Sequence, residues 1–233
     1  MTMGLTGRTA VVTGTAHGIG AAIAEALRSD GAAVWSVDKD DVDLTNADAV
    51  REFFAGLGGV DILVNSAGGV CGQVGHPLED VTDYAWDEIV GANLTSLFFC
   101  TRAVVPGMKE RRWGRIVTIS STAGRTISRT GIQAYASAKA AQIGFTRQMA
   151  HELGPFGITV NCIAPGFIRS NPTTERQWQS YGAEGQRQLV QDIALRRLGE
   201  PADIANGVQF FVSERSAWIT GQTISIDGGH AFL

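Results

Sequence analysis

The segment YASAK places a tyrosine, Tyr135, four residues before a lysine, Lys139, within a predicted helix over 133–153. Residues four apart lie on the same face of a helix. A free phenol has a pKa of about 10 and is a poor base at neutral pH. An ammonium about 4 Å away, at an effective dielectric constant of about 20, would favour the phenolate by about 4 kcal/mol, or roughly three pKa units. The pair is therefore a candidate acid/base centre, although chance produces the same spacing on many helices.

A second candidate site is the glycine-rich segment TGTAHGIG, which lies between a short apolar run and a helix-favouring one. Glycines at such a turn allow the backbone to approach a pyrophosphate, and the helix N-terminus presents amides to the anion. The spacing of Gly14, Gly18 and Gly20 differs from GxGxxG and, taken alone, could equally mark a tight turn. No Lys-Ser/Thr pair follows Gly20, which excludes a P-loop for ATP or GTP.

Asp38 ends the second predicted strand, eighteen residues after Gly20. This is close to the position at which an acid binds the adenosine ribose of a dinucleotide. A carboxylate there would repel the 2′-phosphate of NADP, so the predicted cofactor is NAD. Lys39 and His17 are nearby groups that could accept that phosphate instead, and Asp38 could serve only as a turn residue.

Strand-like and helix-like segments alternate along the 233 residues, without a linker, a repeat or a low-complexity tract. The predicted strands are 9–13, 32–38, 60–65, 115–120, 158–164 and 223–227. The predicted helices are 18–30, 46–57, 83–111, 133–153 and 201–213. This alternation predicts one α/β domain over residues 1–233, with a doubly wound parallel sheet covered by helices on both faces.

One polar stretch, 170–198, interrupts the alternation and contains Trp178 and Tyr181. An insertion of this kind near the carboxyl edge of a sheet often forms a substrate lid. A pair of surface helices is the alternative interpretation.

Composition excludes several other classes of protein. The net charge of −4, without a basic cluster, argues against nucleic-acid binding. The three cysteines are never spaced as CxxC and the four histidines show no metal-ligand spacing, so neither a disulfide framework nor a metal site is predicted. No signal peptide is expected, and no apolar run approaches a membrane span, so the predicted location is the cytoplasm.

Further motifs accompany the two candidate sites in a fixed order. These are TGTAHGIG, NSAG (65–68), GANLTSLF, ISSTAG, YASAK, PGFIRS (165–170) and ITGQTISIDGG (219–229). Together, from about residue 5 to residue 230, they resemble the short-chain dehydrogenase/reductase family. The resemblance implies a Rossmann fold and an NAD(P)-dependent oxidoreductase that acts on CH–OH groups and interconverts a secondary alcohol and a ketone.

The resemblance also implies four catalytic residues. Tyr135 would be the general acid/base, and Lys139 would hold the nicotinamide ribose and lower the pKa of Tyr135. Ser121, rather than the serine before it, would bind the substrate oxygen, because Gly124 follows at the family's spacing. Asn93 would anchor a water that relays protons from Lys139, although it could instead be a polar residue that kinks its helix.

The remaining implied contacts are to the cofactor. The backbone of Ile168 would bind the nicotinamide carboxamide, with the Ser170 hydroxyl nearby. The NSAG segment would line the adenine ribose, and Asp43 and Leu44 the adenine. The full set of implied cofactor residues is Gly14, His17, Gly18, Ile19, Gly20, Asp38, Lys39, Asp43, Leu44, Asn65, Ala67, Gly68, Tyr135, Lys139, Pro165, Gly166, Ile168 and Ser170.

Three features depart from the family's pattern. Ser66 replaces the usual second asparagine of its motif, and Ser170 replaces the more common threonine. Only four residues separate Asp38 from Asp43, so we expect the helix that joins the second and third strands to be missing. The adenine pocket is then expected to be more open than usual.

The sequence leaves other functions possible. One is an NADPH-dependent 3-oxoacyl-type ketoreductase, and another is a nucleotide-binding protein without catalysis, although such proteins usually lack the tyrosine or the lysine. The substrate stays undetermined, and Cys71, His76, Trp178 and Tyr181 are residues that could touch it.

Association with further copies of the chain is also expected. The long helices 83–111 and 133–153 would have apolar faces to bury outside the sheet of a single subunit. In the family such helices pair across a two-fold axis, and C-terminal segments often form a second interface. We therefore expect a homotetramer, with a homodimer as the next possibility.

Overall fold

The structure is a computed structural model that describes residues 4–128 and 130–231. Its centre is a six-stranded sheet of order β2-β1-β3-β4-β5-β6 in which every neighbouring pair is parallel. The strands are β1 (Thr9–Thr13), β2 (Ala33–Val37), β3 (Ile62–Asn65), β4 (Gly114–Ile119), β5 (Ile158–Pro165) and β6 (Thr223–Ile226). The chain moves outward from β1 to β2 and then returns past β1 to β3, which creates a switch point at the carboxyl edge.

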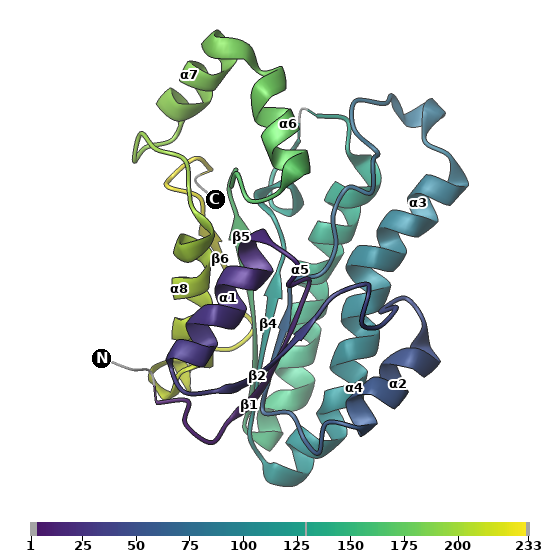
Figure 1. Ribbon diagram of the computed structural model, residues 1–233, viewed down its shortest axis with the longest axis vertical. Coiled ribbons are helices and arrows are strands. Elements are labelled where there is room, and N and C mark those ends of the chain that lie inside the picture. The colour runs from purple at the N-terminus through teal and green to yellow at the C-terminus, as the bar shows by residue number, and fades with distance from the viewer. Residues whose placement is uncertain (1–3, 129, 232–233) are drawn as a thin grey trace.

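Helices cover both faces of the sheet, as Figure 1 shows. On one face α1 (Gly18–Ser29) packs beside α8 (Pro201–Val212), and on the other lie α2 (Ala47–Ala55), α4 (Ser96–Arg111) and α5 (Gln133–Leu153). Successive residues of β1 alternate between the two cores, with Val11 in one and Val12 in the other. The inner strands β1, β3, β4 and β5 are buried on both faces and are mostly apolar, whereas the edge strands β2 and β6 are partly exposed. The prediction of a doubly wound parallel sheet is confirmed.

The predicted helix 83–111 is continuous but not uniform. It consists of α3 (Asp83–Val90), a π-helical turn (Gly91–Thr95) and α4. By length and composition this helix could cross a membrane, which differs from the expectation that no segment approaches that length. Leu97, Val104 and Met108 are buried in the structure, so α4 packs as a core helix.

The expectation that no helix joins the second and third strands is wrong. Helix α2 lies between β2 and β3, and Asn46 caps it by accepting hydrogen bonds from the amides of Asp48 (2.9 Å) and Ala49 (3.2 Å). The connection between β2 and α2 is short, and its backbone turns directly after Asp38.

The polar stretch 170–198 forms two helices, α6 (Pro172–Ser180) and α7 (Gly182–Asp192). Asn171 begins α6 with a capping box to Thr174, and Pro172 occupies the first turn, where its missing N–H costs nothing. Figure 1 places both helices at the end of the molecule toward which the parallel strands run.

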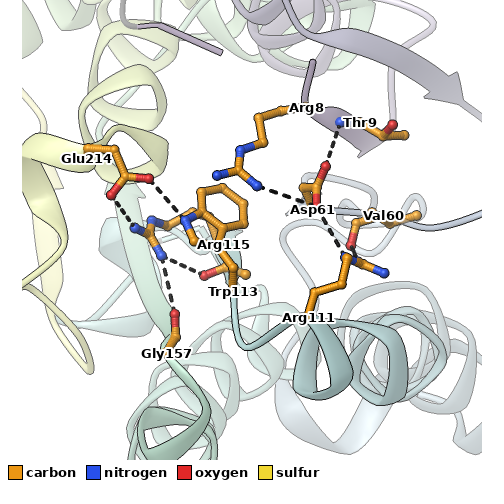
Figure 2. A network of polar contacts seen from close by, with 10 residues as sticks. Arg8, Thr9, Val60, Asp61, Arg111, Trp113, Arg115, Gly157 and Glu214 are labelled. Atoms are coloured by element: carbon orange, nitrogen blue, oxygen red, sulfur yellow. Dashed lines mark hydrogen bonds and ion pairs between the residues drawn. The ribbon is translucent and has the colours of Figure 1, made fainter. Parts of the chain in front are cut away.

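A polar network ties the opposite edge of the sheet together (Figure 2). Asp61, just before β3, accepts a hydrogen bond of 3.0 Å from the amide of Thr9 in β1. Arg115 of β4 is buried, pairs with Glu214 at 3.2 Å and stacks over the Trp113 ring. These contacts fasten the amino ends of β1, β3 and β4, so the loops at the carboxyl edge extend from a fixed base.

Candidate active site

Tyr135 and Ser121 meet at the carboxyl edge, from elements that follow β4. Tyr135 lies in the first turn of α5, and Ser121 lies two residues after β4. Gly124 makes this approach possible, because a Cβ there would lie 2.6 Å from the backbone of Lys139. The two side chains are hydrogen-bonded to each other, and the Ser121 hydroxyl also accepts a bond of 3.1 Å from the amide of Ala123. This pair can hold and protonate one substrate oxygen.

Lys139 is buried beneath this pair, with 4% of its surface exposed. Its Nζ donates to the carbonyl oxygen of Ile119 at 2.8 Å and to Oε1 of Gln142 at 3.3 Å. The same atom lies 5.4 Å from the centre of the Tyr135 ring. Burial lowers the pKa of Lys139 to about 8, and the nearby Cys162 opposes that shift. At neutral pH the site therefore holds a buried ammonium.

The lowering of the pKa of Tyr135 by Lys139 stays a prediction, because in the protein without a cofactor the net shift of this pKa is upward. Burial raises the pKa of Tyr135 above its ordinary value, and the hydrogen bond with Ser121 only partly opposes the rise. The ammonium lies by the ring, and its donors point to Ile119 and Gln142. Desolvation of the phenolate thus outweighs the attraction that spacing alone predicted. Tyr135 is a neutral proton donor at neutral pH.

Asn93 lies fully buried in the π-helical turn. Its Nδ2 donates to the carbonyl oxygens of Gly69 and Ile89, both at 2.8 Å, and its Oδ1 accepts from the amide of Gly69 at 3.1 Å. Gly68 permits this contact, since a Cβ there would collide with Oδ1 of Asn93. The backbone oxygen of Asn93 accepts a bond of 2.7 Å from Nε2 of Gln142. Asn93 thus fastens the loop after β3 and is connected to Lys139 through Gln142.

The glycine turn joins β1 to α1. Gly14 adopts a positive φ of 74°, and a Cβ there would lie 2.8 Å from the backbone of Ala67, while one at Gly20 would collide with the carbonyl of Gly14. Helix α1 begins at Gly18, and its N-cap residue, His17, makes no capping bond with its side chain. The first amides of α1 are therefore available to an anion. Ile19 packs partly buried against the adjacent core.

The NSAG segment is held against this turn. The hydroxyl of Thr13, at the end of β1, accepts bonds of 3.1 Å from the amides of Ser66 and Ala67. Asn65 ends β3 and is buried beside it. The glycine turn and the segment after β3 therefore form one rigid surface.

The predicted adenine side lies at the end of β2. One oxygen of Asp38 accepts a bond of 2.8 Å from the amide of Ala16, so this carboxylate faces the glycine turn. Asp43 is hydrogen-bonded to Thr45, which lowers the pKa of Asp43. Leu44 is buried in the core under α2, which leaves its backbone rather than its side chain to meet a ligand.

The PGFIRS segment closes over the glycine turn from the other side. Pro165 ends β5, and the amide of Gly166 donates to the carbonyl oxygen of Ile226 at 3.0 Å. Ile168 is buried in the core. The backbone of Ser170 lies directly against Gly18, where any side chain would collide with it. The structure thus brings two predicted cofactor segments, far apart in sequence, into contact.

Aromatic side chains attach α6 to this segment. The ring of Phe167 lies 6.2 Å from that of Trp178 and 5.9 Å from that of Tyr181, between ring centres. The predicted lid is therefore docked on the loop that follows β5. Cys71 and His76 are exposed on the loop after β3, which Gln133 of α5 contacts through the carbonyl oxygen of His76.

Two residues outside the predicted set support the site. Ser120 is buried and its hydroxyl donates to the carbonyl oxygen of Lys139 at 2.8 Å, so it stabilises α5 while Ser121 meets Tyr135. Gln142 bridges Lys139 and Asn93. Its position three residues after Lys139, on the same helix face, was the available signal.

These features fit a nicotinamide dinucleotide. The glycine turn presents the first amides of α1 to a pyrophosphate, Asp38 faces the same turn from the end of β2, and the buried Lys139 offers an ammonium beside Tyr135. The bound cofactor would extend along the carboxyl edge from β2 toward β5.

Comparison with known proteins agrees with this site. Residues 38–231 match the family model described as enoyl-(acyl carrier protein) reductase. The chain is similar to the 3-oxoacyl-(acyl-carrier-protein) reductase of Vibrio cholerae, with 36% identity over 97% of this chain and 98% of the relative. It is also similar to the cyclohexanol dehydrogenase of a Rhodococcus species, with 37% identity over 97% of this chain and 96% of the relative.

A solved structure is similar over nearly the whole chain. It is a 3-oxoacyl-(acyl-carrier-protein) reductase from Brucella melitensis with bound NAD, with a TM-score of 0.86, 33% identity, and coverage of 99% of this chain and 94% of that one. The family model, the relatives and the solved structure all indicate the same family. This chain belongs to the short-chain dehydrogenase/reductase family and is an oxidoreductase that binds a nicotinamide cofactor and acts on CH–OH or keto groups.

Proposed function

We propose that the protein is an NAD-dependent oxidoreductase that interconverts a secondary alcohol and a ketone. The observation that carries this proposal is the contact between Tyr135 and Ser121 at the carboxyl edge of the sheet, with Nζ of the buried Lys139 at 5.4 Å from the centre of the Tyr135 ring. A site that only bound the nucleotide would have no need for a phenol beside a buried ammonium.

In ketone reduction, Tyr135 donates its phenol proton to the carbonyl oxygen, which Ser121 holds by a hydrogen bond. The raised pKa of Tyr135 keeps that proton in place at neutral pH. Lys139 would hold the ribose hydroxyls of the cofactor, and its charge would stabilise the phenolate that forms. The nicotinamide, when bound, would supply the hydride for the carbonyl carbon. In alcohol oxidation both transfers run in reverse.

Replacing Tyr135 by Phe tests this assignment. Tyr135→Phe removes the transferable proton and leaves the ring, so turnover is expected to fall by about 10²- to 10⁴-fold, while NADH binding stays unchanged. The assay is NADH absorbance with a panel of sugars, cyclic alcohols, steroids and acyl thioesters. Tyr84→Phe, the same change at an exposed tyrosine of α3, is the matched control. Equal turnover in Tyr135→Phe and the control would contradict the proposal.

NAD is the proposed cofactor because Asp38 lies at the carboxyl end of β2 and faces the glycine turn. A carboxylate there accepts hydrogen bonds from ribose hydroxyls and repels a 2′-phosphate. The solved relative with bound NAD supports the same choice. Lys39, next to Asp38 in the chain, and His17, in the glycine turn, are cations that could accept a 2′-phosphate, so NADP is the alternative cofactor.

Cofactor choice is tested by Asp38→Ser, which keeps an acceptor for the amide of Ala16 and removes the charge. We expect the wild type to have at least a tenfold higher kcat/KM with NAD than with NADP. The variant should lower that ratio about tenfold, or about 1.4 kcal/mol. Asp40→Ser, at an exposed aspartate two residues on, should leave the ratio unchanged. A wild type that prefers NADP would overturn the proposal.

A second candidate is an NADPH-dependent 3-oxoacyl ketoreductase. The similarity to 3-oxoacyl-(acyl-carrier-protein) reductases favours it, and the same panel and cofactor comparison separate it from the first proposal.

The protein is also proposed to be cytoplasmic, which three free thiols support. Trp178, docked on Phe167, supports a lid role for 170–198.

We further propose a homotetramer, with a homodimer as the next possibility. Large apolar side chains are exposed on two separate surfaces, one formed by α3 and α4 and one at α8 and β6. They are Tyr84, Trp86 and Phe98 on the first, and Phe210, Trp218 and Ile224 on the second. Two such surfaces support two different two-fold interfaces. Light scattering should give the mass of four chains, and a monomer would contradict this proposal.

A further inference from the structure

We propose that Gln142 is a positioning residue that fixes the ammonium of Lys139 toward the cofactor. This inference rests on the proposed function, because it takes Lys139 to be part of the working site. It concerns a residue that none of the sequence motifs includes.

Gln142 has 1% of its surface exposed and uses both ends of its amide. Its Oε1 accepts from Nζ of Lys139 at 3.3 Å, and its Nε2 donates to the backbone oxygen of Asn93 at 2.7 Å. The second bond joins α5 to the π-helical turn, 49 residues away in the chain. The amide therefore has a fixed orientation, with its oxygen held toward Lys139.

Lys139 needs such an anchor because its ammonium ends a flexible chain of four methylenes. An ammonium has three N–H donors, and in the described part of the chain two of them point to Ile119 and Gln142. Two fixed acceptors determine the direction of the third N–H. With Ile119 alone, the ammonium could rotate away from the ligand.

Both anchors are neutral, which has a chemical consequence. A carboxylate in place of Gln142 would pair with the ammonium and compensate its charge. The titratable side chains near Lys139 are Tyr135 on α5 and Cys162 on β5, and burial raises the pKa of each. At neutral pH the positive charge is therefore available to the cofactor and to the phenol.

The bridge also links the ammonium to the loop after β3. Asn93, whose backbone oxygen Gln142 holds, binds both the amide and the carbonyl of Gly69 through its side chain. The path from Lys139 through Gln142 and Asn93 to Gly69 consists only of hydrogen bonds between described residues. A substitution of Gln142 is thus expected to change the position of the Lys139 ammonium and to leave the sheet intact.

Two substitutions distinguish positioning from core filling. Gln142→Met keeps the length and volume of the side chain but cannot bridge. Gln142→Ala leaves a polar space beside Lys139 and Asn93 that can hold a water, whose share of liquid volume is about 30 Å³. A water there can accept from Lys139 and donate to Asn93. If Gln142 positions Lys139, Gln142→Ala should impair the protein less than Gln142→Met does. If Gln142 only fills the core, Gln142→Met should be the less harmful substitution.

The matched control is Thr146→Val. Thr146 is fully buried one turn further along α5, and its hydroxyl donates to the carbonyl oxygen of Gln142 at 2.9 Å. The substitution removes a buried hydrogen bond on the same helix face without touching the amide bridge. Thermal melting by circular dichroism confirms that each variant folds, and Gln142→Leu replaces Gln142→Met if the latter does not.

The measurement is the dissociation constant for NADH, read from quenching of tryptophan fluorescence, followed by kcat with an alcohol from the panel. We expect Gln142→Met to weaken NADH binding and to lower kcat, each about tenfold. Gln142→Ala should stay within about threefold of the wild type, and Thr146→Val should match it.

This inference would be overturned, and the proposed function left intact, by either of two results. One is that NADH binding and kcat are at least as impaired in Gln142→Ala as in Gln142→Met, and the other is that Gln142→Met equals the wild type. A wild type that binds no NADH would overturn both. A wild type that binds NADH, with the expected order of variants, supports the inference even before a substrate is found.

Discussion

A buried positive charge is the constraint on which the carboxyl edge of this sheet depends. Lys139 is removed from solvent, yet the groups that hold it are the neutral carbonyl of Ile119 and the neutral amide of Gln142. Burial without a compensating carboxylate is costly, and the lowered pKa of Lys139 reflects that cost. Such a cost is typical of a site in which the charge acts on something other than the protein itself.

The rest of the fold keeps this charge in place. Strands buried on both faces fix α5 against the sheet, and the network around Asp61 and Arg115 holds the opposite edge. At the carboxyl edge, two glycines allow backbone segments to touch where a side chain would collide. Gly124 lies against α5, and Gly18 lies against Ser170. The glycine turn, the phenol and the lysine therefore come from elements that follow the carboxyl ends of β1 and β4.

The sequence was sufficient to predict the parallel sheet, because strands such as TAVVT are buried on both faces and carry no polar residue in the middle. The order of motifs placed Tyr135, Ser121 and Lys139 at one edge. The position of Gln142 on the same helix face as Lys139 was too weak a signal to reveal its bridge, since a polar residue at helical spacing is usually exposed. The π-helical turn around Asn93 agrees with the alternative that this residue kinks its helix, although the sequence did not specify a π-helical geometry. The upward shift in the pKa of Tyr135 in the free protein was not predicted, because spacing gives no measure of burial.

We propose that Tyr135 is a neutral proton donor, because burial raises its pKa despite the neighbouring charge of Lys139. The chain has three tyrosines, so the difference in tyrosinate absorbance between the wild type and Tyr135→Phe, titrated without ligand, isolates this residue. We expect Tyr135 to ionise above the ordinary phenol pKa of about 10. Ionisation near neutral pH in the free protein would contradict it.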